Sequence, residues 1–223
     1  MGPKSTVEKV LGAVALLAML AGSIVGLFVV GADAAQGNVQ RLMYVHVPAA
    51  WLAFLSFFIV FVMSVLYLIQ RDVRWDRVAV SSAEIGVVFT SITLLLGMMW
   101  GKPTWGVYWT WDPRLTTTAI LLAIYVGYLA LRSFADDEDK RARWAAIVGI
   151  IGFANVPLVY MSVTWWRTLH QPPSSPRSVS PDILWTLMLN LAAFTLVYAY
   201  LMVRRIRLAR LEGELEKRMA YNA

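Results

Sequence analysis

Apolar residues in this chain come in long blocks that are separated by short polar segments. Six blocks are each close to the roughly 20 residues that an α-helix needs to cross bilayer hydrocarbon. They cover residues 10–30, 49–69, 83–100, 115–133, 144–165 and 182–203. The pattern predicts an all-α membrane protein with six transmembrane helices. No linker or low-complexity stretch divides the chain, so residues 1–223 are expected to form one domain. The first block is interpreted as a retained helix and not as a cleaved signal peptide.

Local signals mark where several of these spans begin. First-turn prolines, capping boxes and N-cap aspartates are typical of helix N-termini. The signals are Pro48 before the second span, Ser81 with Glu84 before the third, Asp112 with Pro113 before the fourth, and Pro181 with Asp182 before the sixth. Pro157 lies inside the fifth span, where a proline is expected to kink the helix.

Composition supports the membrane interpretation and excludes several kinds of site. The chain is 59% hydrophobic and 15% charged, against roughly a quarter charged in an ordinary soluble domain. It has no cysteine, so disulfides, thiolate metal sites and a C-x-x-C-H haem attachment are excluded. The pair Gly101-Lys102 is not a phosphate-binding loop, because Leu96 and Pro103 break that motif. Any ATP hydrolysis is therefore expected on another chain.

The Lys and Arg residues fix the predicted orientation, since cytoplasmic loops are enriched in them. Fifteen fall on one side of the six spans: Lys4, Lys9, Arg71, Arg74, Arg77, Arg132, Lys140, Arg141, Arg143, Arg204, Arg205, Arg207, Arg210, Lys217 and Arg218. Five fall on the other side: Arg41, Lys102, Arg114, Arg167 and Arg177. The N and C termini are therefore predicted to be cytoplasmic. The net charge of +6 reflects this topology, and no nucleic-acid partner is inferred from it.

Tryptophan is concentrated on the predicted outer side, above all in the segment "WGKPTWGVYWTWD" at residues 100–112. A simple interfacial belt would place tryptophans at both membrane surfaces. Here only Trp75 and Trp144 lie on the cytoplasmic side. The outer-side tryptophans are Trp51, Trp100, Trp105, Trp109, Trp111, Trp165, Trp166 and Trp185. The segment is predicted to be an outer-surface loop or short helix between spans three and four. In a short helix, Trp105 and Trp109 would stack one turn apart.

The chain has two histidines, His46 and His170, and both fall on outer segments that flank the tryptophan segment. Two neutral imidazoles on opposite sides are a common way to hold haem iron. The flat tryptophan side chains suit a planar porphyrin, and the outer-side cations suit its propionates. The alternative interpretation is two solvated loop histidines with ordinary surface charges around them.

The segment "WGVYWTWD", from Trp105 to Asp112, resembles the W-G-x-x-W-x-W-D signature of the haem-handling membrane proteins of cytochrome c biogenesis. The flanking "GMMWGKPTWG" and "DPRLTT" are also similar. The length, the six spans and one histidine on each flanking segment resemble most closely the short CcmC family of haem exporters. The longer CcmF and CcsA relatives have more spans and more histidines. Tyr108 stands at a variable position of the signature.

The resemblance implies a function that the residues alone do not give. It implies non-covalent haem b with bis-histidine ligation at the periplasmic face of a bacterial inner membrane. The haem would be presented to the chaperone CcmE, with the ABC transporter subunits CcmA and CcmB and the one-span protein CcmD as partners. It implies a haem-transfer subunit and no catalytic residue. The site would comprise His46, His170, Trp100, Lys102, Trp105, Gly106, Trp109, Trp111, Asp112 and Arg114.

Two other functions remain open at this stage. A b-type cytochrome subunit for electron transfer would carry paired histidines inside its spans, whereas none of the six predicted spans contains one. A permease subunit without a cofactor would line a path with polar residues. Asn155, Asn190 and three threonines are modest candidates, but apart from Glu84, near the cytoplasmic end of the third span, no charged path across the bilayer is evident. Whether the chain itself moves haem across the membrane is not fixed by the sequence.

Overall fold

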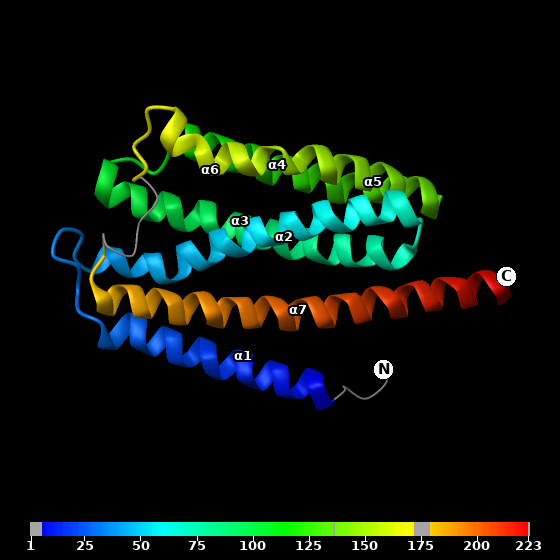
Figure 1. The fold of residues 1–223 in the computed structure, drawn as a ribbon, viewed down its shortest axis with the longest axis horizontal. Helices are drawn as coiled ribbons and strands as arrows, with labels where there is room; N and C mark the ends of the chain where they lie inside the picture. The colour runs from blue at the N-terminus through cyan, green and yellow to red at the C-terminus, as the bar shows by residue number, and fades with distance from the viewer. Residues whose placement is uncertain (1–5, 136, 172–178, 223) are drawn as a thin grey trace.

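The computed structural model describes residues 6–135, 137–171 and 179–222, and these form an elongated helical bundle (Figure 1). Its elements are α1 (Thr6–Ile24), η1 (Val25–Val29), η2 (Asn38–Leu42), α2 (Met43–Gln70), α3 (Val73–Trp105), α4 (Pro113–Ser133), α5 (Glu138–Phe153), α6 (Asn155–Trp165) and α7 (Pro181–Asn222). The element η1 is a π-helical turn that ends the first span, and η2 is a 3₁₀ turn that leads into the second.

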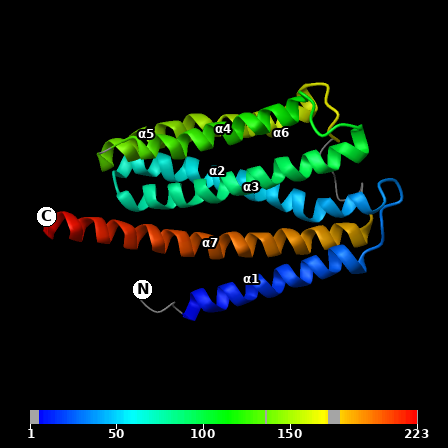
Figure 2. The ribbon, with the colours of Figure 1, turned by 180° about the vertical axis from the view of Figure 1, so that it is seen from behind.

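The prediction of six spans is confirmed among the described residues. Six helical segments are long and apolar enough to cross a membrane: Thr6–Val29, Asn38–Gln70, Val73–Trp105, Pro113–Ser133, Glu138–Trp165 and Pro181–Leu215. The start of α1 and the end of α7 lie at the same end of the bundle (Figures 1 and 2). We call this the terminal end, and the opposite end, which carries the Trp-rich segment, the tryptophan end.

The helices are arranged in three layers (Figure 1). The central layer holds α2 and α3, which pack extensively against each other. On one side lie α4, α5 and α6, and on the other side lies α7 with α1 outside it. Helix α1 packs mainly against α7 and leaves most of its apolar side chains exposed. Exposure of apolar side chains is expected on helices that face lipid.

Two predicted helix starts are wrong, because both helices begin earlier. Helix α2 starts at Met43, so Pro48 lies inside it and does not mark its first turn. Helix α3 starts at Val73, where the Asp72 side chain caps it by accepting the Arg74 backbone N–H. Ser81 is therefore internal, and its hydroxyl donates to the Arg77 carbonyl at 2.7 Å.

The remaining predicted helix signals are confirmed. Asp112 is the N-cap of α4, and Pro113 is its first residue. Helix α7 begins at Pro181. The fifth span is interrupted at Ala154, between α5 and α6. Pro157 lies three residues after this break and has no N–H to donate to the Phe153 carbonyl, which accounts for the interruption.

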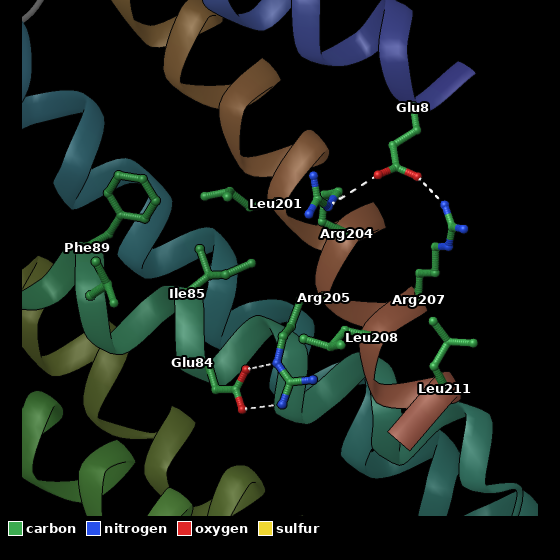
Figure 3. A pocket seen from close by; sticks show the side chains of 11 residues that line it. Glu8, Glu84, Ile85, Phe89, Leu201, Arg204, Arg205, Arg207, Leu208 and Leu211 are labelled. Carbon is green, nitrogen blue, oxygen red and sulfur yellow. Dashed lines mark hydrogen bonds and ion pairs between the residues drawn. The ribbon is translucent and has the colours of Figure 1, made fainter. Parts of the chain in front are cut away.

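Ion pairs tie the terminal ends of three helices together (Figure 3). Glu8 of α1 is almost fully buried and pairs with Arg204 at 3.2 Å and Arg207 at 2.8 Å, both on α7. Glu84 of α3 accepts two hydrogen bonds from Arg205, one of them at 2.8 Å. Glu84 is thus an inter-helix ion-pair partner and not a capping residue. These contacts hold α1 and α3 against α7.

Candidate functional site

A cavity of about 820 Å³ lies at the tryptophan end of the bundle, surrounded by α2, α3, α4 and α6. Phe54, Thr90 and Leu121 are the lining residues of α2, α3 and α4 that lie farthest from the tryptophan end. The loop after α6 contributes Leu169, His170 and Gln171 to the lining. The volume falls in the range of roughly 300–1,000 Å³ that is typical of small-molecule sites. The lining is mostly apolar, with a few convergent polar groups.

His46 projects from the first turn of α2 into this cavity, so the expectation of a loop position is corrected. The ring meets Trp100 edge to face, with centroids 5.8 Å apart. A Cβ at Gly97 would lie 3.3 Å from His46 Cε1, so the glycine on α3 makes room for the imidazole. The buried Nδ1 of His46 has no hydrogen-bond partner among the described residues. An orphaned buried nitrogen is costly unless a ligand or water satisfies it.

His170 lines the same cavity from the loop that follows α6. Its Nδ1 lies 2.9 Å from the Gln171 carbonyl oxygen. A carbonyl can only accept, so Nδ1 carries the proton and Nε2 keeps its lone pair. This is the arrangement that metal-binding histidines usually adopt. Burial lowers the pKa of His170, and the bond to Gln171 opposes that effect in part. The ring is therefore neutral near pH 7.

Asp112 holds the histidine loop in place instead of facing the cavity. One carboxylate oxygen accepts the Arg114 backbone N–H at 2.8 Å and caps α4. The other accepts the Thr168 hydroxyl and the Leu169 N–H, both at 2.7 Å. Thr168 in turn accepts the His170 backbone N–H at 3.0 Å. The last residue of the tryptophan signature thus fixes the backbone next to His170.

The tryptophans of the signature divide between the cavity and the surface. Trp100 and Trp105 line the cavity, whereas Trp109 and Trp111 do not. Helix α3 ends at Trp105, so the predicted stacking of Trp105 on Trp109 in a short helix is wrong. Trp109 and Trp111 instead meet edge to face at 5.7 Å, and Trp111 is 82% exposed.

Two glycines shape the end of α3, one at the turn that follows it and one beneath the Trp105 ring. Gly106 ends the helix with a φ of 82°, in the left-handed region that favours glycine. A Cβ at Gly101 would lie 3.0 Å from the Trp105 ring, which folds back over this position. Gly106 of the signature therefore has a backbone role.

Arg114 is the cation that lines the cavity. Its Nη1 donates to the carbonyls of Val159 at 2.9 Å and Tyr160 at 3.1 Å, and this contact ties α4 to α6.

Lys102 does not line the cavity, because its ammonium donates to the Gly106 carbonyl at 3.0 Å. Arg41 donates to the Gly26 carbonyl at 3.0 Å and also bonds the Leu27 carbonyl. Arg177 lies outside the described residues.

The sequence did not single out several residues that shape this cavity. Gln36 accepts the indole N–H of Trp100 at 3.0 Å and so orients the ring that packs on His46. Thr168 accepts the His170 backbone N–H, and Gly97 makes room for the His46 ring. Their roles depend on contacts across 64 and 56 residues of sequence, and no local pattern signals such contacts.

The cavity combines two imidazoles, flat indole rings, apolar helix faces and one half-buried cation. Both histidines line it from different segments of the chain. Such a site can hold a flat, largely apolar ligand whose metal accepts imidazole nitrogen. A carboxylate on that ligand could pair with the Arg114 guanidinium. Among the described residues no cluster of three or more His, Cys, Asp or Glu could hold a bare metal ion.

Known proteins resemble this chain over most of its length. Residues 3–221 match the family described as Heme exporter protein C. The Heme exporter protein C of Bradyrhizobium diazoefficiens is 39% identical over 179 residues, which cover 78% of this chain and 68% of that protein. The Heme exporter protein C of Escherichia coli K12 is 37% identical over 193 residues, or 86% and 79% of the two chains.

A putative cytochrome c biosynthesis ccmC-like mitochondrial protein of Marchantia polymorpha is 42% identical over 148 residues, or 66% of this chain and 62% of that protein. The resemblance that the tryptophan signature indicated is therefore confirmed. The match covers nearly every residue, and the six membrane-spanning segments agree with it. From these matches we conclude that the chain belongs to the heme exporter protein C (CcmC) family.

Proposed function

We propose that this chain binds one haem in the cavity at the tryptophan end and delivers it for cytochrome c maturation. The observation that carries the proposal is that the only two histidines of the chain line one cavity. They reach it from different elements, α2 and the loop after α6. Two solvated loop histidines would not be expected to line the same cavity.

The residues of the cavity fit haem b as a non-covalent ligand. The unpartnered Nδ1 of His46 and the oriented ring of His170 indicate two imidazoles prepared for a ligand. These two side chains would provide the axial nitrogens. Trp100 and Trp105 would pack on the porphyrin, and Arg114 would pair with a propionate. The iron would supply the redox and ligand chemistry, and the protein would supply position and exclusion of water.

The other predicted site residues have supporting roles in this proposal. Asp112 and Gly106 shape the backbone around the cavity, and Lys102 stabilises the end of α3. The exposed Trp111, together with Trp109, would form the surface at which a partner receives the haem edge. Aromatic side chains are enriched in such binding surfaces.

Charge and family support an orientation in the membrane and a set of partners. The tryptophan end carries few Lys and Arg residues, so we place it at the periplasmic face of the bacterial inner membrane. The family relationship supports the chaperone CcmE as haem acceptor, and CcmA, CcmB and CcmD as members of the assembly. No catalytic residue is assigned to this chain.

An optical and binding experiment on the purified chain tests the proposal. Haem titrated into the protein should give one saturable site with a six-coordinate, low-spin spectrum. Co-purification with the chaperone then separates haem presentation from electron transfer in a b-type cytochrome subunit. A protein that takes up no haem in detergent or in nanodiscs would favour the cofactor-free permease and contradict the proposal.

A further inference from the structure

The wall of the haem cavity has one junction that is not closed by helix packing. Four helices surround the cavity: α2, α3, α4 and α6. Helix α2 packs on α3, α3 packs on α4, and α4 packs on α6. Among the described elements, the junction between α6 and α2 lacks comparable packing. Near the tryptophan end, α6 lies beside α4 and apart from α2 (Figures 1 and 2).

The break in the fifth span produces this separation. Before the break, α5 packs tightly on α2: a Cβ at Gly149 would lie 3.0 Å from Val60, and Phe153 stacks on Phe61 at 4.7 Å. After it, α6 is tied to α4. The Asn155 amide donates to the Thr117 carbonyl at 2.8 Å, and Arg114 bonds two α6 carbonyls. The break near Pro157 thus separates α5, which packs on α2, from α6, which packs on α4.

The side chains on both sides of this junction are apolar and belong to the cavity lining. Helix α2 contributes Trp51 and Phe54, and α6 contributes Pro157 and Tyr160. Trp51 is 45% exposed and Tyr160 is 53% exposed, so the two rings lie at the outer edge of the cavity. From His46 to Phe54 the helix descends about 12 Å at 1.5 Å per residue. The junction therefore lies in the outer half of a hydrocarbon core about 30 Å thick.

We infer that the cavity opens sideways into the outer leaflet of the bilayer, between α2 and α6, and that its ligand passes through this opening. We call it the lateral opening, with Trp51 and Tyr160 at its two edges. This inference rests on the proposed function in that the ligand is a membrane-dissolved iron porphyrin. Such a ligand has an apolar body that suits the lipid-facing opening and carboxylates that suit Arg114 at the tryptophan end. Trp105, Leu169 and Gln171 line the cavity at the tryptophan end.

Cross-linking across the opening tests this route directly. The chain has no cysteine, so the double variant Trp51→Cys, Tyr160→Cys carries thiols at the two edges alone. A short bismaleimide applied before haem should slow loading by at least about tenfold relative to the same variant treated with N-ethylmaleimide. Applied after haem, it should slow release to apomyoglobin by a similar factor. If haem passes through the opening, blocking it should slow loading and release by the same factor and leave the equilibrium affinity for haem unchanged.

A matched control uses a junction away from the cavity. Gly12 faces Tyr200 and Gly22 faces Asn190 across the α1–α7 contact. In this register Ile24 lies opposite Met188, and both are exposed. The same reagent on Ile24→Cys, Met188→Cys should leave the loading rate unchanged. Loading of the cross-linked Trp51 and Tyr160 variant at the N-ethylmaleimide rate would overturn the lateral route but leave the haem site standing.

The unmodified chain provides a second measurement that does not depend on these variants. In nanodiscs whose lipid already holds haem, the protein should load even when excess apomyoglobin removes haem from water. If apomyoglobin abolishes loading, the ligand arrives from the aqueous side and the lateral route is wrong. If the unmodified chain takes up no haem from lipid or from water, the proposed function itself has failed.

Discussion

The Asp112 carboxylate accepts the Thr168 hydroxyl at 2.7 Å, and this bond joins two loops that are 56 residues apart in sequence. Because the other Asp112 oxygen caps α4, one side chain fixes both the start of a helix and the loop that carries His170. The acidic residue of the tryptophan signature is thus a positioning residue for a histidine.

Replacing Asp112 by Asn should separate these two roles. The Asn side-chain oxygen can still cap α4, but its NH₂ group cannot accept from Thr168 or Leu169. Losing hydrogen bonds to a charged, buried acceptor costs about 1.5–3 kcal/mol, so we expect haem affinity to fall at least about tenfold. Equilibrium titration measures this change. Thr168→Val removes one bond to Asp112 and also the acceptor of the His170 backbone N–H, so it should weaken haem binding as well; unchanged affinity in both variants would contradict the assignment.

The two histidines should each be required for the six-coordinate spectrum. His46→Gly and His170→Gly each remove one proposed ligand nitrogen, and each should give a high-spin spectrum and at least about tenfold weaker binding, or 1.4 kcal/mol. Added imidazole should restore the low-spin spectrum, because it can occupy the space that the side chain leaves. A variant whose spectrum does not change would show that the residue concerned is not a ligand.

Haem affinity should depend on pH through His170. In the proposed site, protons would compete with iron for its Nε2, and burial lowers the pKa of this ring. The affinity should therefore stay constant on acidification through about pH 6.5, the ordinary histidine value, and decline only as the pH approaches the lowered pKa of His170. Titrations at a series of pH values measure this. His170→Met replaces the ring with a thioether that does not titrate, so this contribution should disappear.

The folding stability of the chain should also fall on acidification. The pKa of His170 in the folded chain lies below its unfolded value, so the unfolded chain takes up the proton first as the pH falls. Stability is therefore lost as the pH drops below the unfolded value of about 6.5. Thermal unfolding of the haem-free chain with and without His170→Met isolates this contribution.

Trp100 should position His46 through its bond to Gln36. Gln36→Leu removes the acceptor of the indole N–H, at a cost of about 0.5–1.5 kcal/mol for a neutral hydrogen bond. We expect the low-spin spectrum to persist while the haem potential and affinity shift, since His46 keeps its nitrogen but loses a fixed neighbour. Gln36→Glu keeps an acceptor and should behave more like the parent chain. Identical haem potentials in the parent chain, Gln36→Leu and Gln36→Glu would exclude this positioning role of Gln36 and Trp100.

The hydrophobic pattern predicted the number of spans but not all of their ends. Apolar blocks reveal where lipid surrounds a helix, whereas α2 begins at Met43, before its longest apolar run. This start is set by contacts with other segments, because Met43 and Tyr44 are buried against residues of the first and sixth spans. The Asp112-Pro113 signal was reliable because the cap and the proline act within one turn.

The candidate site shows the same division between local and distant causes. The signature predicted which residues lie near the site, but not which of them face the cavity. Trp105 faces it because it folds back over Gly101, and Trp109 does not, because Gly106 ends the helix between them. His46 was predicted in a loop and lies in a helix, where Gly97 of another span makes room for it. Such pairings follow from tertiary structure alone.

The ion pairs at the terminal end should stabilise the bundle without affecting the haem site. Glu8 is 2% exposed and pairs with two arginines of α7 (Figure 3). Glu8→Gln removes the negative charge that both arginines contact, and the loss should be smaller than the roughly 3–5 kcal/mol of a fully buried pair, because the Arg204 and Arg207 side chains are 45% and 33% exposed. Glu8→Gln should still lower the thermal midpoint in detergent clearly. Haem affinity should not change, since the cavity lies near the opposite end of spans about 30 Å long.

An exposed ion pair on the same helix provides the matched control. Glu212 pairs with Arg205 at 3.2 Å, and its side chain is 52% exposed. Surface pairs contribute about 0–1 kcal/mol, so Glu212→Gln should leave the thermal midpoint nearly unchanged. If Glu8→Gln had no larger effect than Glu212→Gln, α1 would be held by its apolar contacts with α7 and not by Glu8. If Glu8→Gln weakened haem binding in a chain that remained folded, the terminal end and the cavity would be coupled, contrary to the expectation of independent regions.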